Sequence, residues 1–235
     1  MNRESGFWRG AIDALPVQLV IVPFGVIFGA IATQAGLNLS EAMAMSILVL
    51  AGAAQIAAVQ MLSDQAPVLL VIVTGLFINL RFAMYSASLE PYWRGSPLWK
   101  RALAAYLMVD QAYGLSIHRY LENKQEPQAQ RIAYYFGIAL PTVSFWYMGT
   151  ALGALLGAAI PPQLSLEFAV PLTFIAITAP MLRGIPSVTA AVVAVTTALV
   201  CHSLPYNLGL MVAAFTGMGC GVWVENIITD GVGDE

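Results

Sequence analysis

The sequence predicts an all-α, polytopic integral membrane protein, and three features of its composition lead to this prediction. Its 235 residues include only 10 Lys and Arg and 13 Asp and Glu, so charged residues make up 10%, against about 25% in soluble globular proteins. Hydrophobic residues make up 59%, and the mean hydropathy is +0.75. This leaves too little polar surface to cover a water-soluble domain. The net charge of −3, without a Lys/Arg-rich run, also argues against nucleic acid as a partner.

Long intervals without a charged residue locate the first membrane spans. A bilayer core takes about 20 apolar residues per helix, because every backbone polar group must be satisfied inside the span. The first two uncharged intervals hold 27 and 22 residues, and a third apolar run follows them. They predict spans at 14–34, 41–62 and 67–89.

The fourth predicted span, 99–119, is apolar except for Asp110 and Gln111. Basic residues flank it on both sides, so it is either a full crossing or a re-entrant or interfacial segment. Beyond it, uncharged intervals of 35, 15 and 41 residues predict the remaining spans. These lie at 133–159, 168–182, 186–203 and 207–227. The prediction is a single transporter domain over 1–235 with seven or eight transmembrane helices.

The N-terminal segment and the sidedness leave alternatives open. Arg3 and Arg9 precede an apolar run that ends in small residues at 30–32, as a secretory signal peptide does. The run is longer than a usual signal-peptide core, so a retained first span is expected. If all eight spans cross and the N-terminus is cytoplasmic, six basic residues lie inside and three outside. If 99–119 does not cross, the basic loops that flank it share one side, and the N-terminus changes sides.

Short sequence matches predict a weak internal repeat. Many secondary transporters are built from such repeats, with the substrate site at mid-membrane. The copies are inverted if 99–119 does not cross and parallel if it does. The matches, at offsets of 125, 125 and 124, are Leu15-Pro16 with Leu140-Pro141, Leu39-Ser40 with Leu164-Ser165, and Gly25…Gly29-Ala30 with Gly149…Gly153-Ala154.

Two segments are candidates for broken helices with a polar lining. Pro23 and Gly25 lie near the middle of the first span, where Pro removes a helix hydrogen bond and Gly loosens the next turn. They indicate either a break whose amides meet a substrate carboxylate or a packing kink. In the second span, Gly52 lies in a run of small residues that Gln55 follows. Gln55 is expected to bond either to a neighbouring helix or to a ligand.

Arg81 and Asp110 are the ionisable residues that lie well inside predicted spans. An unpaired charge in the membrane costs several kcal/mol, so embedded charges usually pair and mark a transport path or proton relay. We therefore predict that Arg81 and Asp110 lie close together, the alternative being that Arg81 snorkels to the interface. Asn79, Tyr85 and Gln111 are accessory polar candidates.

Glycines at four-residue spacing predict close helix packing in two later spans, with a subunit interface as the alternative. These are Gly149, Gly153 and Gly157, and then Gly217 and Gly221. Motifs for enzyme chemistry are missing from the sequence: it has no Walker A, zinc-protease or dinucleotide fingerprint. No enzyme activity, cofactor or metal is predicted.

In order and spacing, the polar segments resemble the AzlC family, the large subunits of branched-chain amino acid exporters of the LIV-E type. The resemblance covers almost the whole chain. It is carried by Val22-Pro23-Phe24-Gly25, Ala51-Gly52-Ala53-Ala54-Gln55, Asn79-Leu80-Arg81 with Tyr85 and Ser88-Leu89, and Asp110-Gln111-Ala112-Tyr113. The chain has Asn79, Phe82 and Gln111 where family members have Asp, His and Glu. Two potential acids are therefore missing, which bears on any scheme of proton coupling.

The resemblance implies a secondary transporter of the bacterial inner membrane that exports leucine, isoleucine, valine or methionine. It also implies a partner, a separately encoded small membrane subunit of the AzlD type. An ATP-driven permease would need an ATPase, and the sequence shows no coupling helix on which one docks. Ion-coupled export is therefore the expected activity.

A site for such a substrate needs donors for the carboxylate, an acceptor for the ammonium and an apolar pocket. We assign the carboxylate to amides at the Pro23/Gly25 and Gly52 breaks, and the ammonium or a coupling proton to Asp110. Arg81 would balance Asp110 in the empty site, and Gln55 and Asn79 would line it. The rival interpretations are a non-transporting scaffold subunit and an intramembrane enzyme, which would need a nucleophile pair or metal cluster.

Overall fold

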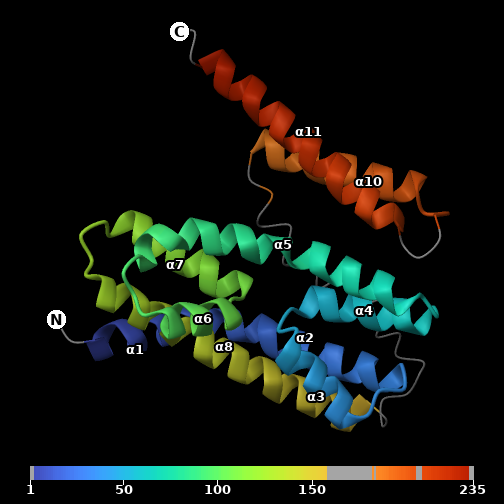
Figure 1. Ribbon diagram of the computed structural model, residues 1–235, viewed down its shortest axis with the longest axis horizontal. Coiled ribbons are helices and arrows are strands. Elements are labelled where there is room, and N and C mark those ends of the chain that lie inside the picture. The colour runs from blue at the N-terminus through green and yellow to red at the C-terminus, as the bar shows by residue number, and fades with distance from the viewer. Residues whose placement is uncertain (1–2, 158–181, 183, 205–207, 233–235) are drawn as a thin grey trace. The chain divides into compact units, whose positions relative to one another are not determined.

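The computed structural model describes residues 3–157, 182, 184–204 and 208–232, and every regular element in these ranges is an α-helix (Figure 1). The predicted all-α membrane fold is confirmed. The span predicted at 168–182 lies, except for its last residue, outside the described residues. The helices are α1 (Arg3–Asp13), α2 (Leu15–Gln34), α3 (Leu39–Leu48), α4 (Gly52–Ser63), α5 (Val68–Trp93), α6 (Leu98–Tyr106), α7 (Asp110–Glu122), α8 (Gln128–Gly157), α10 (Ile185–Val200) and α11 (Leu208–Val232).

The chain divides into two compact units, Met1–Gln60 with Val71–Glu167, and Met61–Leu70 with Phe168–Glu235. In the second unit, α10 and α11 pack against each other. A Cβ on Gly217 would lie 2.8 Å from the carbonyl oxygen of Ala190, and one on Gly221 would lie 3.0 Å from the Ala190 Cβ. These glycines form a helix-packing face within the chain, as predicted.

Three helices of the described residues, α2, α5 and α8, are long and apolar enough to cross a membrane. All three coincide with predicted spans and differ from them by at most five residues at either end. Shorter apolar stretches lie at Leu39–Leu48, Ile185–Val200 and Val212–Ile228.

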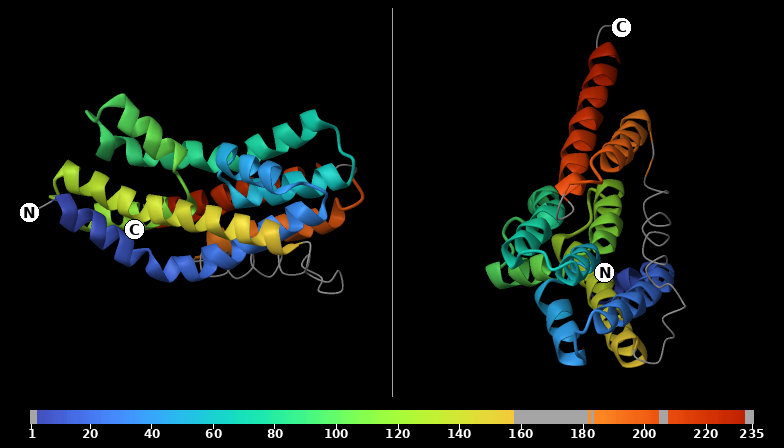
Figure 2. Two further views of the ribbon diagram at one scale, coloured as in Figure 1. Left: turned by 90° about the horizontal axis from the view of Figure 1, so that it is seen from below. Right: turned by 90° about the vertical axis from the view of Figure 1, so that its right-hand side faces the viewer.

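In the first unit, α2 and α8 pack along their length and run in the same direction (Figures 1 and 2). A Cβ on Gly25 would lie 3.0 Å from the Trp146 carbonyl oxygen, and one on Gly149 would lie 2.9 Å from the Val22 carbonyl oxygen. Each glycine thus faces the carbonyl three residues before the other. The same reciprocal contact joins the next pair of repeat positions: Gly29 faces Thr150, and Gly153 faces Val26.

This reciprocity relates the two helices by a local twofold axis, with equivalent residues 124 apart. The hydrogen bond from Gln18 Nε2 to Thr142 Oγ1, at 3.0 Å, joins residues with the same offset. The predicted repeat is therefore supported for this helix pair, and the two copies run parallel. Gly149 and Gly153, with Gly157 against Ala30, form the predicted packing face inside the fold.

The break expected at Pro23 and Gly25 is not present. α2 continues through Pro23 from Leu15 to Gln34, and Pro23 is exposed whereas Gly25 is buried against α8. Proline removes one hydrogen bond, and close packing on both sides of that position holds the helix together. Gly25 therefore serves helix packing, the other of the two interpretations, and a role of Pro23 and Gly25 in a substrate path stays a prediction.

A substitution in this interface tests its tightness. Gly153→Ala is expected to destabilise the protein by about 2 kcal/mol, because the added Cβ collides with the backbone of Val26 and overpacking of this kind costs roughly 1–3 kcal/mol. Gly75→Ala on α5 is the matched control, since a Cβ there meets nothing within 4 Å. Thermal unfolding of the detergent-purified variants measures both. Equal midpoints for the two would contradict the tight packing.

Two of the predicted spans are not continuous helices. This corrects the expectation for 41–62, and for 99–119 it agrees with the re-entrant alternative. The first is interrupted at residues 49–51, between α3 and α4, and the second at 107–109, between α6 and α7. Both interruptions are turns at which the chain reverses. We name α3 with the first part of α4 hairpin A (39–60) and α6 with α7 hairpin B (98–122).

Contacts define the reversal in hairpin B. Gln128 Nε2 donates to the carbonyl oxygens of Tyr92 and Arg94, so α5 ends where α8 begins. α6 starts there and runs with α8, and Tyr135 donates to the Ala104 carbonyl at 2.7 Å. α7 then returns alongside α5 (Figure 1).

Hairpin A begins just after the C-terminal end of α2. Asn38 caps α3 in a reciprocal capping box with Glu41, which fixes where the helix starts. α3 ends beside the middle of α8, where Ser46 Oγ lies 3.2 Å from Thr150 Oγ1. α4 starts there and turns back toward the end where α3 began (Figure 1).

The tips of the two hairpins meet. The Tyr106 hydroxyl, at the end of α6, donates to the Ile47 carbonyl oxygen at 2.9 Å and lies 3.0 Å from the Tyr147 hydroxyl. The Ile47 carbonyl is in the last turn of α3 and has lost its helix donor, so Tyr106 satisfies it. The first unit thus combines three long apolar helices with two hairpins that turn back midway.

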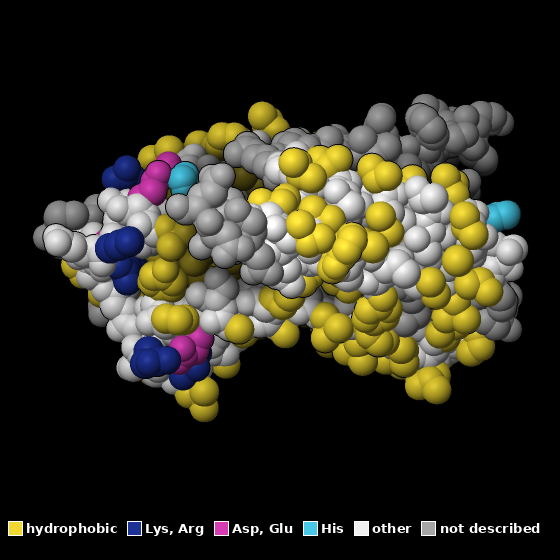
Figure 3. Space-filling model, turned by 90° about the horizontal axis from the view of Figure 1, so that it is seen from above, with side chains coloured by type: hydrophobic (Ala, Val, Ile, Leu, Met, Phe, Trp, Pro, Cys, Tyr) yellow, Lys and Arg dark blue, Asp and Glu magenta, His cyan; other side chains and the backbone are white. Residues whose placement is uncertain are grey.

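Basic residues gather at one end of the first unit, as the dark blue side chains of Figure 3 show. This end joins α1, the α5–α6 connection and the α7–α8 connection, which the contacts of Gln128 and the hydrogen bond from Tyr134 to Asp13 bring together. At the other end, the α2–α3 connection has no Lys or Arg, and the first turn of α3 has Glu41. The basic residues of the first end are Arg9, Arg94, Lys100, Arg101, Arg119, Lys124 and Arg131.

Candidate functional site

The tip of hairpin B holds the predicted ion pair. Arg81 Nη1 of α5 lies 3.0 Å from Asp110 Oδ2, and the two side chains are 30% and 33% exposed. Their predicted proximity is confirmed, and α5 extends a further twelve residues beyond Arg81 to Trp93. Asp110 is the first residue of α7, where the helix N-terminus favours a negative charge.

Tyrosines of α5 and α7 surround this pair. The Tyr85 hydroxyl donates to Asp110 Oδ1 at 3.1 Å, and the Tyr85 ring stacks on Tyr113 with centroids 4.1 Å apart and planes 8° apart. Tyr113 in turn donates to Ser88 Oγ at 3.1 Å. Tyr85 and Arg81 therefore each occupy one oxygen of Asp110, and the stacked rings fix the spacing of α5 and α7.

The tip of hairpin A holds a second polar group. Gln55 is fully buried, and its Nε2 donates to Ser46 Oγ at 3.2 Å. Its Oε1 and the Nε1 of Trp146 are buried without a hydrogen-bond partner among the described residues. Buried polar atoms of this kind are rare unless water or a ligand satisfies them.

Gly52 sits where the backbone of α4 approaches aromatic rings. A Cβ at this position would lie 2.7 Å from Trp146 Cη2 and 2.9 Å from Phe24 Cε1. Gln55 is the first residue of α4 whose amide bonds back, to the Ala51 carbonyl. The earlier amides have no acceptor within the helix, so this helix start offers donors beside an apolar wall.

The other accessory candidates, Asn79 and Gln111, lie near the ion pair in sequence. Asn79 lies on α5 two residues before Arg81, and its Oδ1 is buried without a partner in the part of the chain that the structure describes. Gln111 follows Asp110 at the start of α7 and is half-buried. Their role in a substrate or ion path stays a prediction, as does that of Gly52, Gln55, Arg81, Tyr85 and Asp110.

Five residues of this region were not predicted from the sequence. Ser46 and Thr150 extend the Gln55 network, Trp146 covers Gly52, and Tyr106 and Tyr147 join the hairpin tips. They are ordinary residues of apolar segments, so only the three-dimensional contacts distinguish them. Among the described residues, no three His, Cys, Asp or Glu side chains are grouped as metal ligands.

Comparison with known proteins places the chain in a family. Residues 16–160 match the family model described as AzlC protein. An uncharacterized membrane protein of Archaeoglobus fulgidus is 27% identical over 228 residues, covering 95% of this chain and 97% of that protein. The inner membrane protein YgaZ of Escherichia coli is 26% identical over 226 residues, covering 93% and 89%. No solved structure matches the chain. The chain therefore belongs to the AzlC family, a family of membrane transporters, and is a multi-pass membrane protein.

Proposed function

We propose that the protein is a proton-coupled secondary transporter that exports leucine, isoleucine, valine or methionine through a single transporter domain. The observation that carries the proposal is the ion pair between Arg81 and Asp110 at a helix start inside an apolar protein. Charges held within a membrane domain mark transport paths and proton relays. The family match and the resemblance to branched-chain amino acid exporters supply the substrate class.

The hairpin tips offer what an apolar zwitterion needs. The first amides of α4 and the Nε1 of Trp146 are donors for a carboxylate, and the rings of Trp146 and Phe24 form an apolar wall. Gln55 Oε1 and Asp110 are acceptors for an ammonium group. The bond from Tyr106 to Ile47 brings both tips together.

Proton coupling is assigned to Asp110. Its carboxylate is held by Arg81 and Tyr85 in the empty site, and a substrate ammonium or a proton would release Arg81. Asn79 and Gln111 cannot share this role, because an amide side chain does not ionise. Asp110 is therefore the acid on which the exchange of proton and substrate depends in this proposal.

The basic end of the first unit is assigned to the cytoplasm. Hairpins that turn back place the N-terminal helix and both basic connections on one side of the membrane, and loops rich in Lys and Arg remain cytoplasmic. Of the two orientations left open by the span count, the proposal adopts the one with a cytoplasmic N-terminus. Export would then load substrate from the basic end.

A small membrane subunit of the AzlD type is the proposed partner. The family resemblance supports it. The exposure of α5 is compatible with such a partner, because only 6% of its apolar window is buried within this chain. Lipid or a partner helix would cover the remaining surface.

Efflux measurements test the function. Cells expressing this chain with its small partner are preloaded with a leucine-containing dipeptide, and release of radiolabelled leucine is followed. We expect faster efflux than in cells without the chain, and a protonophore should abolish the difference. Cells that express the partner alone are the control. Unchanged efflux in every case would refute amino acid export and favour a scaffold subunit.

A further inference from the structure

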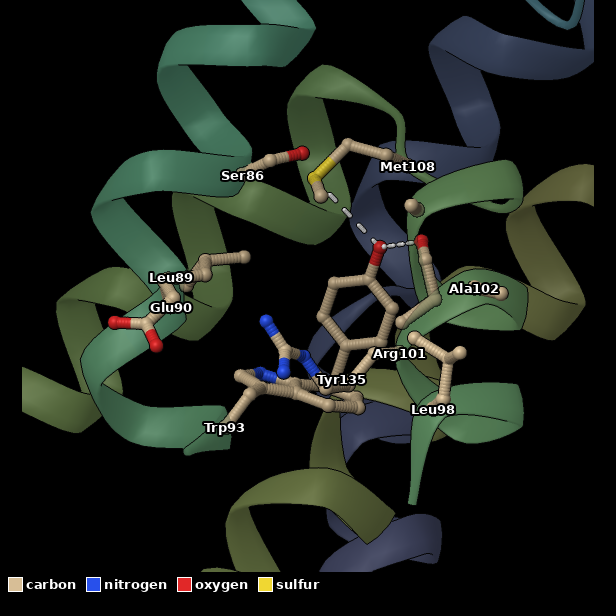
Figure 4. Close-up of a pocket in the computed structure, with 11 residues that line it drawn as sticks. Ser86, Leu89, Glu90, Trp93, Leu98, Arg101, Ala102, Met108 and Tyr135 are labelled. Carbon is tan, nitrogen blue, oxygen red and sulfur yellow. Dashed lines mark hydrogen bonds between the residues drawn. The ribbon is translucent and has the colours of Figure 1, made fainter. Parts of the chain in front are cut away.

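A separate pocket lies between α5, α6 and α8, near the basic end of the first unit (Figure 4). Its volume is about 280 Å³. This is just below the usual range of roughly 300–1,000 Å³ for ligand pockets, so it suits a molecule of amino-acid size.

The interior of the pocket is apolar. Leu89, Trp93, Met108 and Tyr135 line it, and each is at most 5% exposed. The Tyr135 hydroxyl donates to the Ala104 carbonyl and lies 3.7 Å from Met108 Sδ, as the dashed lines in Figure 4 show. Because this hydroxyl is already satisfied, the floor favours an aliphatic side chain.

Charges of both signs line the same pocket. Glu90 contributes a carboxylate, which Arg94 holds through Nε at 3.3 Å and Nη2 at 3.0 Å. Arg101 contributes a guanidinium that has no hydrogen bond or close ion pair to the described residues. A free guanidinium binds a carboxylate through two parallel hydrogen bonds. Glu90 lines the same pocket, and its side chain is 36% exposed.

The pocket borders the segments that hold the ion pair. On α5, its residue Ser86 follows Tyr85, and on hairpin B its residue Met108 lies two positions before Asp110.

We infer that this pocket is a cytoplasmic loading site for the amino acid, and the inference rests on the proposed function. Arg101 binds the substrate carboxylate, Glu90 lies near its ammonium, and the aliphatic side chain fills the space beside Trp93 and Met108. A zwitterion suits this charge pair better than an anionic lipid headgroup does, since Glu90 would repel a phosphate.

The test measures uptake of radiolabelled leucine into inverted membrane vesicles, which expose the cytoplasmic face, with the small partner present. Arg101→Gln is expected to raise KM about tenfold or more, because a hydrogen bond to a charged group contributes roughly 1.5–3 kcal/mol. Vmax should stay within about twofold, since the central site is intact. Arg101→Lys should restore only part of the affinity, because the ammonium keeps the charge but cannot form two parallel hydrogen bonds.

Lys100→Gln is the matched control. It removes the same charge from the neighbouring residue of α6, which does not line this pocket, so its KM should equal that of the wild type. An unchanged KM in Arg101→Gln, or an equal rise in Lys100→Gln, overturns the loading site.

Two further outcomes separate the alternatives. If the KM shift of Arg101→Gln appears only in proteoliposomes that contain anionic phospholipid, Arg101 binds a headgroup and the inference is overturned. If the wild-type vesicles take up no leucine, the proposed function and the loading site fail together. If the wild type takes up leucine and the KM of Arg101→Gln equals that of the wild type, the loading site is refuted and the proposed function stands.

Discussion

Asp110→Asn is expected to reduce leucine efflux to the level of cells that lack the protein, while the amount of protein in the membrane stays normal. The asparagine keeps the size of the side chain, and its one carbonyl oxygen can accept a hydrogen bond from Arg81 or from Tyr85, whereas its amide nitrogen only donates. It can neither bind a proton reversibly nor neutralise an ammonium group. The change therefore removes the charge on which the proposed exchange depends and keeps most of the geometry around the 3.0 Å contact.

The control for this variant lies on the same helix. Glu122 ends α7, and its side chain is 62% exposed, so Glu122→Gln should export leucine like the wild type. Quantitative blotting of membranes reports the level of each variant. Efflux that persists in Asp110→Asn at normal protein level would remove Asp110 from the transport mechanism.

Much of the first unit could be predicted from charge-free intervals. α2, α5 and α8 lie at the long apolar segments, because an apolar segment of about 20 residues is stable only in a membrane or a protein core. The Arg81–Asp110 contact could also be predicted, since an unpaired charge in an apolar environment is costly. Both predictions rest on solvation, which depends on composition more than on detailed packing.

Hairpin A was not predicted, and for hairpin B the sequence left a crossing and a re-entrant segment open, because a re-entrant pair of helices and a single crossing helix need the same apolar length. Residues 107–109 are Leu, Met and Val, which carry no turn signal. The turn is stabilised by contacts distant in sequence, above all those of Tyr106 with Ile47 and Tyr147. Asp110 gave one usable clue, since an acid inside an apolar run suits a helix start.

At Pro23 the sequence left two interpretations open, a break and a packing kink. A proline and a glycine suggest a break, yet α2 continues because Gly25 permits close contact with α8. The offset of 124 between α2 and α8 was visible in the sequence. Whether the two helices run parallel or antiparallel was not, because this follows only when both hairpins are known to turn back.

The hairpins have a further consequence that can be measured, namely the sidedness of three connections. We expect the α5–α6 and α7–α8 connections to lie in the cytoplasm and the end of α2 to lie outside. After Cys201 and Cys220 are replaced by serine, single cysteines are introduced at Pro97, Lys124 and Gln34, which are all exposed. A membrane-impermeant maleimide should label Gln34→Cys in intact cells, and the other two only after permeabilisation.

Each alternative topology gives a different labelling pattern. If hairpin B crossed the membrane, Pro97→Cys and Lys124→Cys would be labelled from opposite sides, and the contacts that align α6 with α8 and α7 with α5 would be wrong. If the orientation were reversed, both would react in intact cells and Gln34→Cys would not. The expected pattern alone agrees with seven basic residues at one end, since moving them across the membrane would oppose the strongest determinant of topology.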